Sequence, residues 1–218
     1  HPGVILYHIS NEFGGECYCP LCAEKFRGYL AERFNGDIEK LNQAWWTTFW
    51  SHHYNSFEEI EPPYANGEGS VMGLNLEWKR FTTWNTIDFM KTEIEALRSV
   101  TPEIPVTANL MRLFNGLDYR KLVKELDVVS WDNYPSNQDT PAQIALSHEL
   151  MRGIGGGKPF LLMEQTPSVT NWLPYNALKR PGVMRLWSYQ AVAHGADSVM
   201  FFQMRRSIGA CEKYHGAI

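Results

Sequence analysis

Residues 127–134 read DVVSWDNY, a short, mostly apolar run that ends in polar residues, and stretches of this form decide the fold class of the chain. Four other stretches have the same form, and they lie at residues 4–9, 105–110, 159–163 and 197–202. Near-continuous apolar runs without strict alternation are typical of parallel strands that are covered on both faces. The sequence therefore predicts five buried strands in a parallel sheet.

Helical patterns lie between the predicted strands. They cover about residues 21–34, 37–46, 74–100, 119–125, 141–152 and 181–194. Strands that alternate with helices predict an α/β fold in which helices connect neighbouring parallel strands. From the second strand onward, the strands start about 20 to 40 residues apart, which fits a (β/α)₈ barrel or a doubly wound sheet.

No glycine-rich phosphate loop follows any predicted strand in the sequence. The glycine cluster at residues 153–157 precedes a strand, so we interpret it as a turn from a helix into a strand. A nucleotide-binding sheet is therefore the weaker choice.

The charge balance limits the classes of partner. The 218 residues include 24 acidic and 20 basic side chains, a net charge of -4, without a basic stripe. No apolar run approaches the roughly 20 residues that a membrane-spanning helix needs, and no secretory leader is visible. We expect neither nucleic acid nor a membrane as a partner, and we expect a cytoplasmic location.

Aromatic residues make up 13% of the chain, and many of them lie beside turn residues and carboxylates. One interpretation is a well-filled core, because aromatic side chains bury large areas. The other is a sugar-binding cleft, because the apolar faces of pyranose rings stack on aromatic side chains. Composition alone leaves both interpretations open.

Two glutamates occupy equivalent positions on two predicted strands. Glu12 follows Asn11 at the end of the first strand, and Glu164 precedes Gln165 at the end of the fourth. In a barrel, residues at the carboxyl ends of the strands converge on one pocket. Two facing carboxyl groups there can cleave a glycosidic bond, since one protonates the departing oxygen and the other meets the positive charge at the anomeric carbon. Either glutamate alone is more simply a helix cap or a surface ion pair, but the pair favours a glycosidase site.

Several motifs, taken in chain order, resemble those of one known family. They are Asn11-Glu12-Phe13-Gly14-Gly15, Phe49-Trp50-Ser51, Trp131-Asp132-Asn133-Tyr134-Pro135, Met163-Glu164-Gln165, Met184-Arg185-Leu186-Trp187-Ser188, His194-Gly195-Ala196-Asp197-Ser198-Val199 and Glu212-Lys213-Tyr214-His215. This ordered set covers essentially the whole chain and is similar to the catalytic domain of family 42 glycoside hydrolases, the β-galactosidases.

The resemblance implies a fold and a reaction. The family has a (β/α)₈ barrel followed by further domains, and it hydrolyses terminal β-D-galactosides with retention of configuration. By position, Glu12 on the fourth barrel strand is expected to be the acid/base. Glu164 on the seventh strand is expected to be the nucleophile that forms a galactosyl-enzyme.

The resemblance also implies the residues that bind galactose. They are Asn11 near the 2-hydroxyl group, Tyr134 close to the nucleophile, Trp50 and Trp172 as aromatic walls, and Glu212 with His215 as a hydroxyl-binding pair. From the residues alone, Trp50 could equally be a core residue and His215 a surface histidine. His8 could be a metal ligand, but because it lies within a strand run we interpret it as a satisfied core or layer residue.

The same resemblance matches the first strand of this chain to the fourth strand of the family's barrel, so barrel strands one to three are expected to be absent. Five strands cannot close a barrel, so both edges of the sheet would be open unless another segment or chain covers them. We expect residues 1–218 to be the C-terminal part of a catalytic domain, inactive or weakly active alone. The full-length parent, expected to be a homo-oligomer, would be the enzyme. Residues 45–84 are expected to form a long insertion over the active-site face.

Three cysteines form a C-x-C-x2-C cluster, and they are Cys17, Cys19 and Cys22. Their spacing predicts a structural zinc site, with a disulfide as the alternative. In the family, some members hold zinc on this cluster with a fourth cysteine from earlier in the chain, a part that is missing here. We do not assign Cys211 as a ligand, and we expect no cofactor for the catalysis.

Two alternatives to a β-galactosidase remain open. A retaining barrel glycosidase with another sugar specificity would use the same two glutamates, because only the hydroxyl-binding residues distinguish the sugars. A non-catalytic carbohydrate-binding fragment is the second alternative, although binding alone has no need of the carboxyl pair.

Overall fold

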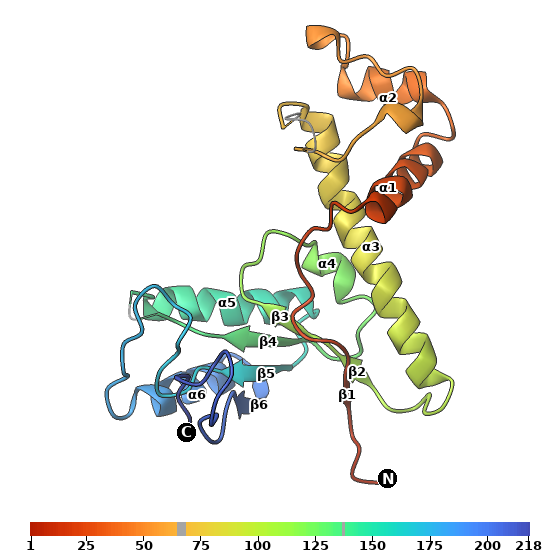
Figure 1. The fold of residues 1–218 in the computed structure, drawn as a ribbon. Coiled ribbons are helices and arrows are strands. Elements are labelled where there is room, and N and C mark those ends of the chain that lie inside the picture. The colour runs from red at the N-terminus through yellow and green to blue at the C-terminus, as the bar shows by residue number, and fades with distance from the viewer. Residues whose placement is uncertain (65–68, 137) are drawn as a thin grey trace. The chain divides into compact units, whose positions relative to one another are not determined.

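The computed structural model describes residues 1–64, 69–136 and 138–218, and it divides into two compact units. The first unit consists of His1–Phe13, Met90–Asn115 and Tyr119–Ile218, and the second consists of Gly14–Phe89 and Gly116–Asp118. Helix α3 (Met72–Arg98) is the element that the division cuts, at Met90 (Figure 1).

The strands of the first unit are parallel, which confirms the predicted α/β class. β1 (Tyr7–His8) pairs with β2 (Val106–Thr107), and a four-stranded sheet has the order β3 (Asn109–Met111), β4 (Ser130–Asn133), β5 (Phe160–Gln165), β6 (Ala196–Phe201). The single strand predicted at residues 105–110 is thus two strands, interrupted at Ala108.

Three helices accompany the strands, and they are α4 (Tyr119–Leu122), α5 (Pro141–Ile154) and α6 (Val183–Ala193). α5 packs against β4 and α6 against β6 (Figure 1). α5 begins with a capping box, in which Thr140 and Gln143 satisfy each other's backbone N–H groups. It ends at a turn in which Gly156 and Gly157 have φ values of 70° and 81°, so the predicted helix-to-strand turn is confirmed.

The polar residues that were expected to follow the strands are instead their last members. β4 includes Asp132 and Asn133, and β5 includes Glu164 and Gln165. Polar side chains are tolerated there because they bond to each other, as when Asn133 Nδ2 donates to Gln165 Oε1 at 2.9 Å. These strands therefore carry chemical groups at their carboxyl ends, where the strand pairing has register irregularities between Trp131 and Asp132 and between Leu162 and Gln165.

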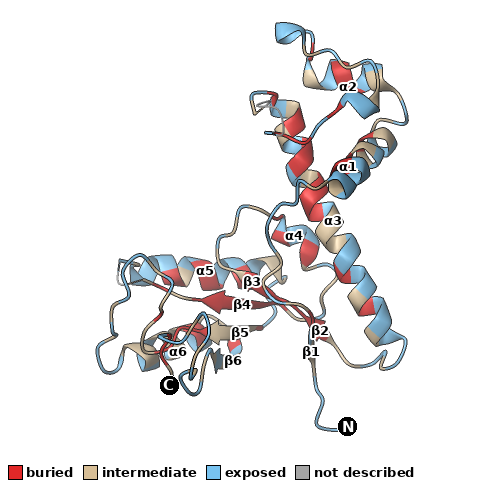
Figure 2. Ribbon diagram, in the orientation of Figure 1, coloured by how far each residue is buried: buried red, intermediate tan, exposed pale blue. Residues whose placement is uncertain are grey.

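The first strand is shorter and less buried than predicted. β1 contains only Tyr7 and His8, and Ile5, expected to be buried, is 80% exposed. His8 is exposed as well, so its interpretation as a core residue is wrong. Among the strands, β2, β3 and β4 are the most buried (Figure 2). The apolar residues just before β1 are exposed because β1 pairs with only one strand among the described residues.

The second unit is helical. It contains α1 (Pro20–Arg33), α2 (Ile38–Trp45), the short 3₁₀ helices η1 (Phe49–Ser51) and η2 (Phe57–Glu59), and α3 up to Phe89. Its core consists of Phe26, Leu30, Leu41, Ile60, Val71, Leu74, Trp78 and Phe81. Of residues 45–84, those from Met72 onward are helix, and residues 65–68 lie outside the described residues.

Among the helices of the described residues, none combines the length and apolar character that a bilayer crossing requires.

Candidate active site

A cavity of about 830 Å³ lies in the first unit, where the strands end. Its lining includes six of the predicted site residues, and they are Asn11, Glu12, Tyr134, Glu164, Trp172 and Glu212. Asp132, Phe202 and residues 111–114 complete the lining. Residues that are far apart in the sequence thus share one concave surface, as expected for parallel strands that end on one side.

The strand register brings two carboxyl groups together. Asp132 on β4 is the pairing partner of Glu164 on β5, and Met111 on β3 pairs with Asp132 on the other side. Paired residues on neighbouring strands project from the same face of a sheet. The register therefore places Asp132 and Glu164 side by side.

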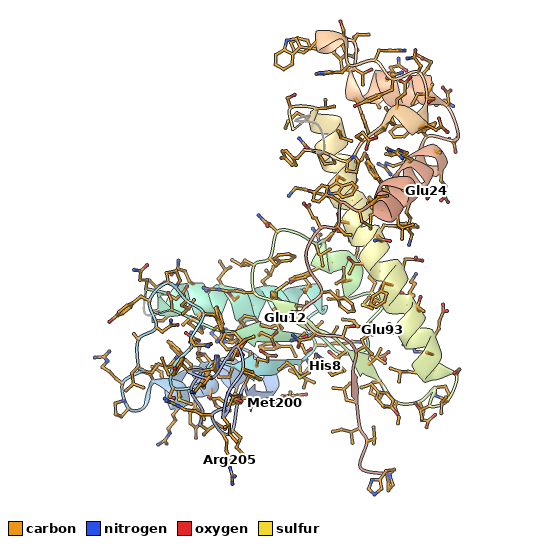
Figure 3. All side chains as sticks on the ribbon, viewed as in Figure 1. His8, Glu12, Glu24, Glu93, Met200 and Arg205 are labelled. Carbon is orange, nitrogen blue, oxygen red and sulfur yellow. The ribbon has the colours of Figure 1, made fainter. Side chains whose placement is uncertain are left out.

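Glu12 reaches the cavity from the segment after β1. Ser10 and Glu12 both have left-handed backbone conformations, with φ values of 47° and 46°. Such conformations cost energy in non-glycine residues and persist only where surrounding contacts hold them. One such contact is the Ser10 hydroxyl, which lies 2.8 and 2.9 Å from the two carboxylate oxygens of Glu93 on α3. Figure 3 shows Glu12 on this segment and Glu93 on α3.

Three carboxyl groups meet in the cavity. One oxygen each of Glu12, Asp132 and Glu164 lies within 4.8 Å of the other two. The Tyr134 hydroxyl donates a hydrogen bond of 2.6 Å to Glu164 Oε2. Oxygen atoms at this spacing can share protons or a divalent cation.

Asn109, which the sequence analysis did not single out, connects these groups. Its fully buried side chain donates through Nδ2 to Asp132 Oδ2 at 2.6 Å and to Asn11 Oδ1 at 3.0 Å, with Glu164 Oε1 at 3.5 Å. Its Oδ1 accepts from the backbone N–H of Glu12 at 2.8 Å. The available signal was a polar amide residue within the apolar run at residues 105–110.

The exposed His8 is linked to the same amide. His8 Nε2 lies 2.9 Å from Asn109 Oδ1, and Figure 3 shows His8 on β1, close to the start of the Glu12 segment. His8 thus touches the site through Asn109.

Burial and mutual repulsion shape the electrostatics of the carboxyl groups. Asp132 is only 3% exposed, and burial, the charge of Glu164 and the interaction with Glu12 raise its pKa to about 9. Burial also raises the pKa of Glu164, as does the charge of Glu12, whereas the Tyr134 hydrogen bond lowers it. Carboxyl groups this close do not all ionise at neutral pH, so the site holds at least one proton. Chemically, it can supply both an acid and a nucleophilic carboxylate.

The predicted sugar-binding residues differ in their placement. Trp172 is half-exposed at the cavity wall, and its ring meets the Tyr134 ring edge-on with centroids 5.1 Å apart. His215 does not line the cavity and is buried, so the alternative of a surface histidine is wrong. Its Nε2 lies 3.1 Å from the Phe202 carbonyl oxygen, and its Nδ1 lies 3.4 Å from Glu212 Oε2. His215 therefore stands behind Glu212 and not at the cavity surface.

Trp50 belongs to the second unit, on η1, and its placement relative to the cavity stays a prediction. The side chain is 71% exposed. The alternative of a core residue is therefore wrong.

The cysteine cluster of the second unit fits a structural metal. The Sγ atoms of Cys17, Cys19 and Cys22 all lie within 4.8 Å of one another. All three cysteines are free, so the structure does not contain the alternative disulfide. Thiolates around tetrahedral zinc lie about 3.8 Å apart, given Zn–S bonds of about 2.3 Å. The backbone N–H of Cys22 lowers the pKa of Cys19, whereas burial raises the pKa of Cys22 to about 12. Within the described part of the chain, this group of thiols that could hold a metal consists of these three residues.

Fold and site together define the class: an α/β protein whose parallel strands end at a cavity lined by paired carboxyl groups. The family model of glycoside hydrolase family 42, described as Beta-galactosidase, matches residues 1–218. The chain belongs to this family.

Individual relatives agree with the family. The chain is 53% identical over 227 residues to Beta-galactosidase Pbg of Clostridium perfringens, and the match covers 100% of this chain and 33% of that protein. It is 52% identical over 225 residues to Beta-galactosidase BgaP of Planococcus sp., with the same coverage. The chain thus spans about a third of the length of these relatives.

Solved structures agree as well. The β-galactosidase from Bacillus circulans sp. alkalophilus matches with a TM-score of 0.97 and 55% identity, over 100% of this chain and 33% of that one. A catalytic mutant of Gan42B, a GH42 β-galactosidase from G. stearothermophilus, matches with a TM-score of 0.93 and 47% identity, over 97% of this chain and 33% of that one. The parallel sheets described above are therefore part of the fold of this family.

Proposed function

We propose that this chain is the part of a retaining β-galactosidase that carries both catalytic carboxyl groups. The full-length protein hydrolyses terminal non-reducing β-D-galactosides through a covalent galactosyl-enzyme. The observation that carries the proposal is the placement of Glu12 and Glu164 in one cavity with oxygens within 4.8 Å. Retaining glycosidases hold their two carboxyl groups about 5–5.5 Å apart, whereas inverting enzymes need about 6.5–9.5 Å to admit a water molecule. Relatives named β-galactosidases, about 50% identical to the chain, support the sugar.

The two glutamates have different roles in this proposal. Glu164 attacks the anomeric carbon as the glycosidic C–O bond breaks, and Glu12 gives its proton to the departing oxygen. Water then displaces Glu164 from the sugar while Glu12 takes the proton of that water, which restores both groups. The Tyr134 hydroxyl, bonded to Glu164 Oε2, orients the nucleophile and leaves Oε1 for the attack. In the Gan42B catalytic mutant a glutamate is replaced by alanine, which is consistent with carboxylate catalysis.

Three further residues of the cavity lining bind the galactose in this proposal. Asn11 donates to the sugar near its 2-hydroxyl group, and Trp172 supplies an apolar wall beside Tyr134. Glu212 accepts hydrogen bonds from sugar hydroxyl groups, and His215 supports it from behind. Trp50 is proposed as a second aromatic wall.

The chain contributes about strands four to eight of a (β/α)₈ barrel in this proposal. Both terminal strands, β1 and β6, have one strand neighbour among the described residues. Apolar side chains are exposed near both, including Ile5 before β1 and Met200 on β6, which Figure 3 labels. Open strand edges with exposed apolar residues call for a partner. We propose that the rest of the full-length protein, a homo-oligomer, covers them, and that residues 45–84 are an insertion over the active-site face.

Cys17, Cys19 and Cys22 would hold a structural zinc ion, with a fourth ligand from outside this chain. The ion would fix the backbone between Cys17 and the start of α1, because Cys19 is the N-cap residue of that helix. It would take no part in the hydrolysis.

The direct test is Glu164→Gln in the full-length protein. The amide cannot form the galactosyl-enzyme, so kcat for nitrophenyl galactoside falls by at least about 10⁴-fold, and azide restores turnover with a glycosyl azide as the product. Glu103→Gln, at an exposed glutamate, is the matched control and keeps the activity. An active Glu164→Gln protein would refute the assignment.

Nitrophenyl galactoside, glucoside and arabinoside together test the sugar. Preference for the galactoside by the full-length protein is the expected result. Preference for another sugar supports the alternative glycosidase, and binding of galactose without any hydrolysis supports the non-catalytic alternative.

A further inference from the structure

The two-glutamate mechanism assigns no role to the carboxyl group of Asp132. Hydrolysis needs Glu164 ionised and Glu12 able to gain and lose a proton, but a third carboxyl group lies within 4.8 Å of both. If Asp132 were ionised, its charge would oppose the ionisation of Glu164 and would hold the proton on Glu12 in the step in which it must leave. The arrangement works only if Asp132 is neutral.

We infer that Asp132 is a positioning residue that keeps its proton at neutral pH and, with Asn109, forms a neutral hydrogen-bonded pair beside the two glutamates. This inference rests on the proposed function of Glu12 and Glu164. Asp132 itself contacts no substrate in this proposal and acts through its neighbours.

The hydrogen bonds of Asp132 favour the neutral acid. Its Oδ2 accepts from Asn109 Nδ2 at 2.6 Å, whereas its buried Oδ1 has no hydrogen-bond partner within the described part of the chain. A buried carboxylate with one oxygen lacking a donor is strongly disfavoured, because charge in a low-dielectric interior needs compensation. The side chain of Asp132 also interacts with that of Glu12 as a hydrogen-bond partner. Two ionised carboxylates have no donor between them, so a proton on Asp132 both removes the charge and supplies a donor.

The groups that face Asp132 supply no positive charge. They are the carboxyl groups of Glu12 and Glu164, the phenols of Tyr119 and Tyr134, and the amide of Asn109. The His8 imidazole is separated from Asp132 by Asn109, whose Oδ1 it contacts at 2.9 Å. Burial and the two glutamates raise the pKa of Asp132 to about 9, in agreement with a proton held at neutral pH.

Asn109 connects the neutral Asp132 to both glutamates through hydrogen bonds. The same amide that donates to Asp132 accepts from the Glu12 backbone N–H and approaches Glu164 Oε1 at 3.5 Å. With Asp132 neutral, Asn109 holds the left-handed turn at Glu12 in place without adding charge next to the nucleophile. Neutral carboxylic acids that serve as hydrogen-bond donors in apolar sites are a known device of enzymes.

The test is Asp132→Asn in the full-length protein, with Asp197→Asn, at an exposed aspartate of β6, as the matched control. Asparagine copies a neutral acid, since its oxygen can accept from Asn109 while its NH₂ group replaces the O–H donor. The expected kcat/KM stays within about tenfold of the parent, and both limbs of the pH–rate profile below pH 9 move by less than about half a pH unit. A shift of both limbs by a unit or more to lower pH overturns the inference, because it shows that a negative charge was removed. A loss of more than about 100-fold in a folded variant overturns it as well, because a neutral side chain of the same shape would then have failed to replace Asp132.

Infrared spectroscopy provides a readout that requires no activity. At pH 7 the parent, labelled with ¹³C at aspartate carboxyl groups, is expected to show an isotope-shifted carbonyl band of a buried neutral acid. The band is missing from Asp132→Asn where that variant folds and present in Asp197→Asn. Absence of the band in the parent overturns the inference, as does a band that appears only after a chelator is added, since that assigns a divalent cation to the site. Failure to hydrolyse galactosides would instead refute the proposed function and leave the infrared result to decide the state of Asp132.

Discussion

Asn109 and His148 are both fully buried polar side chains, and they differ in how their polar atoms are satisfied. Asn109 uses both ends of its amide to join the site residues. His148 on α5 packs its ring between Phe160 and His194 and edge-on to Trp131, and within the described residues neither of its nitrogens has a hydrogen-bond partner. The buried amide of Asn109 thus connects the residues of the site, whereas the unpaired nitrogens of His148 cost stability.

His148 makes the first unit sensitive to acid. Burial, and then the neighbouring His194, lower its pKa from 6.5 to about 4. Between pH 6.5 and pH 4 the histidine is protonated in the unfolded chain but neutral in the folded one. The contribution of His148 to the free energy of unfolding is therefore fully present above pH 6.5 and decreases by about 3 kcal/mol as the pH falls to 4. His148→Leu is expected to remove most of this loss, as seen in hydrogen exchange of α5 measured across that pH range.

His53→Gln is the control for this prediction, because His53 is an exposed histidine of the second unit and its replacement leaves the acid sensitivity of α5 in place. An α5 exchange rate with the same pH dependence in His148→Leu and in the parent would contradict the assigned cause.

At the scale of elements, short strands that end in polar residues position the chemistry. β4 and β5 are only four and six residues long, yet their register sets Asp132 beside Glu164. A slip of one residue would turn every side chain to the opposite face and separate the carboxyl groups. The apolar residues that hold the register, such as Trp131 and Leu162, are therefore as necessary to the site as the carboxyl groups.

The segment that leads into α1 is the element whose order is expected to depend on the proposed zinc ion. Cys17→Ser in the full-length protein is expected to weaken zinc binding by more than the 10–100-fold that loss of an outer-shell partner costs. The first turn of α1 is then expected to exchange its amide hydrogens faster, because Cys19 occupies the N-cap position of that helix. Zinc content by mass spectrometry and hydrogen exchange of α1 are the measurements.

Cys211→Ser is the matched control, since Cys211 is an exposed free thiol of the first unit. Equal zinc content in Cys17→Ser, Cys211→Ser and the parent would show that the cluster is not the zinc site.

At the scale of the whole molecule, the chain aligns with about a third of each relative, and its sheets have unpartnered edges within the described structure. Catalytic carboxyl groups tolerate little displacement, since a misplacement of about 1 Å can cost about 100-fold in rate. A site on an open sheet lacks the support that fixes such positions. The positions of the two glutamates, and with them the activity, are therefore expected to depend on the rest of the parent protein.

Residues 1–218 expressed alone are accordingly expected to be at least about 100-fold less active on nitrophenyl galactoside than the full-length protein. Co-expression of the remaining segments should restore activity by covering the edges of β1 and β6. Glu164→Gln in the co-expressed chain is the control that ties any restored activity to this site. Full activity of the separate chain would contradict the proposed partial barrel.

The sequence by itself determined the α/β class, the positions of the helices and the candidate carboxyl pair, because apolar periodicity and polar strand ends are local features. Strand lengths were predicted less well, since whether Ile5 is buried or Asp132 lies within a strand depends on neighbours that are distant in sequence. Only the tertiary structure revealed Asn109 as the link between the site residues and Asp132 as a third carboxyl group. Hydrogen bonds across 23 to 97 residues of chain, and the repulsion of charges buried together, are set by strand register and burial, and no local pattern records them.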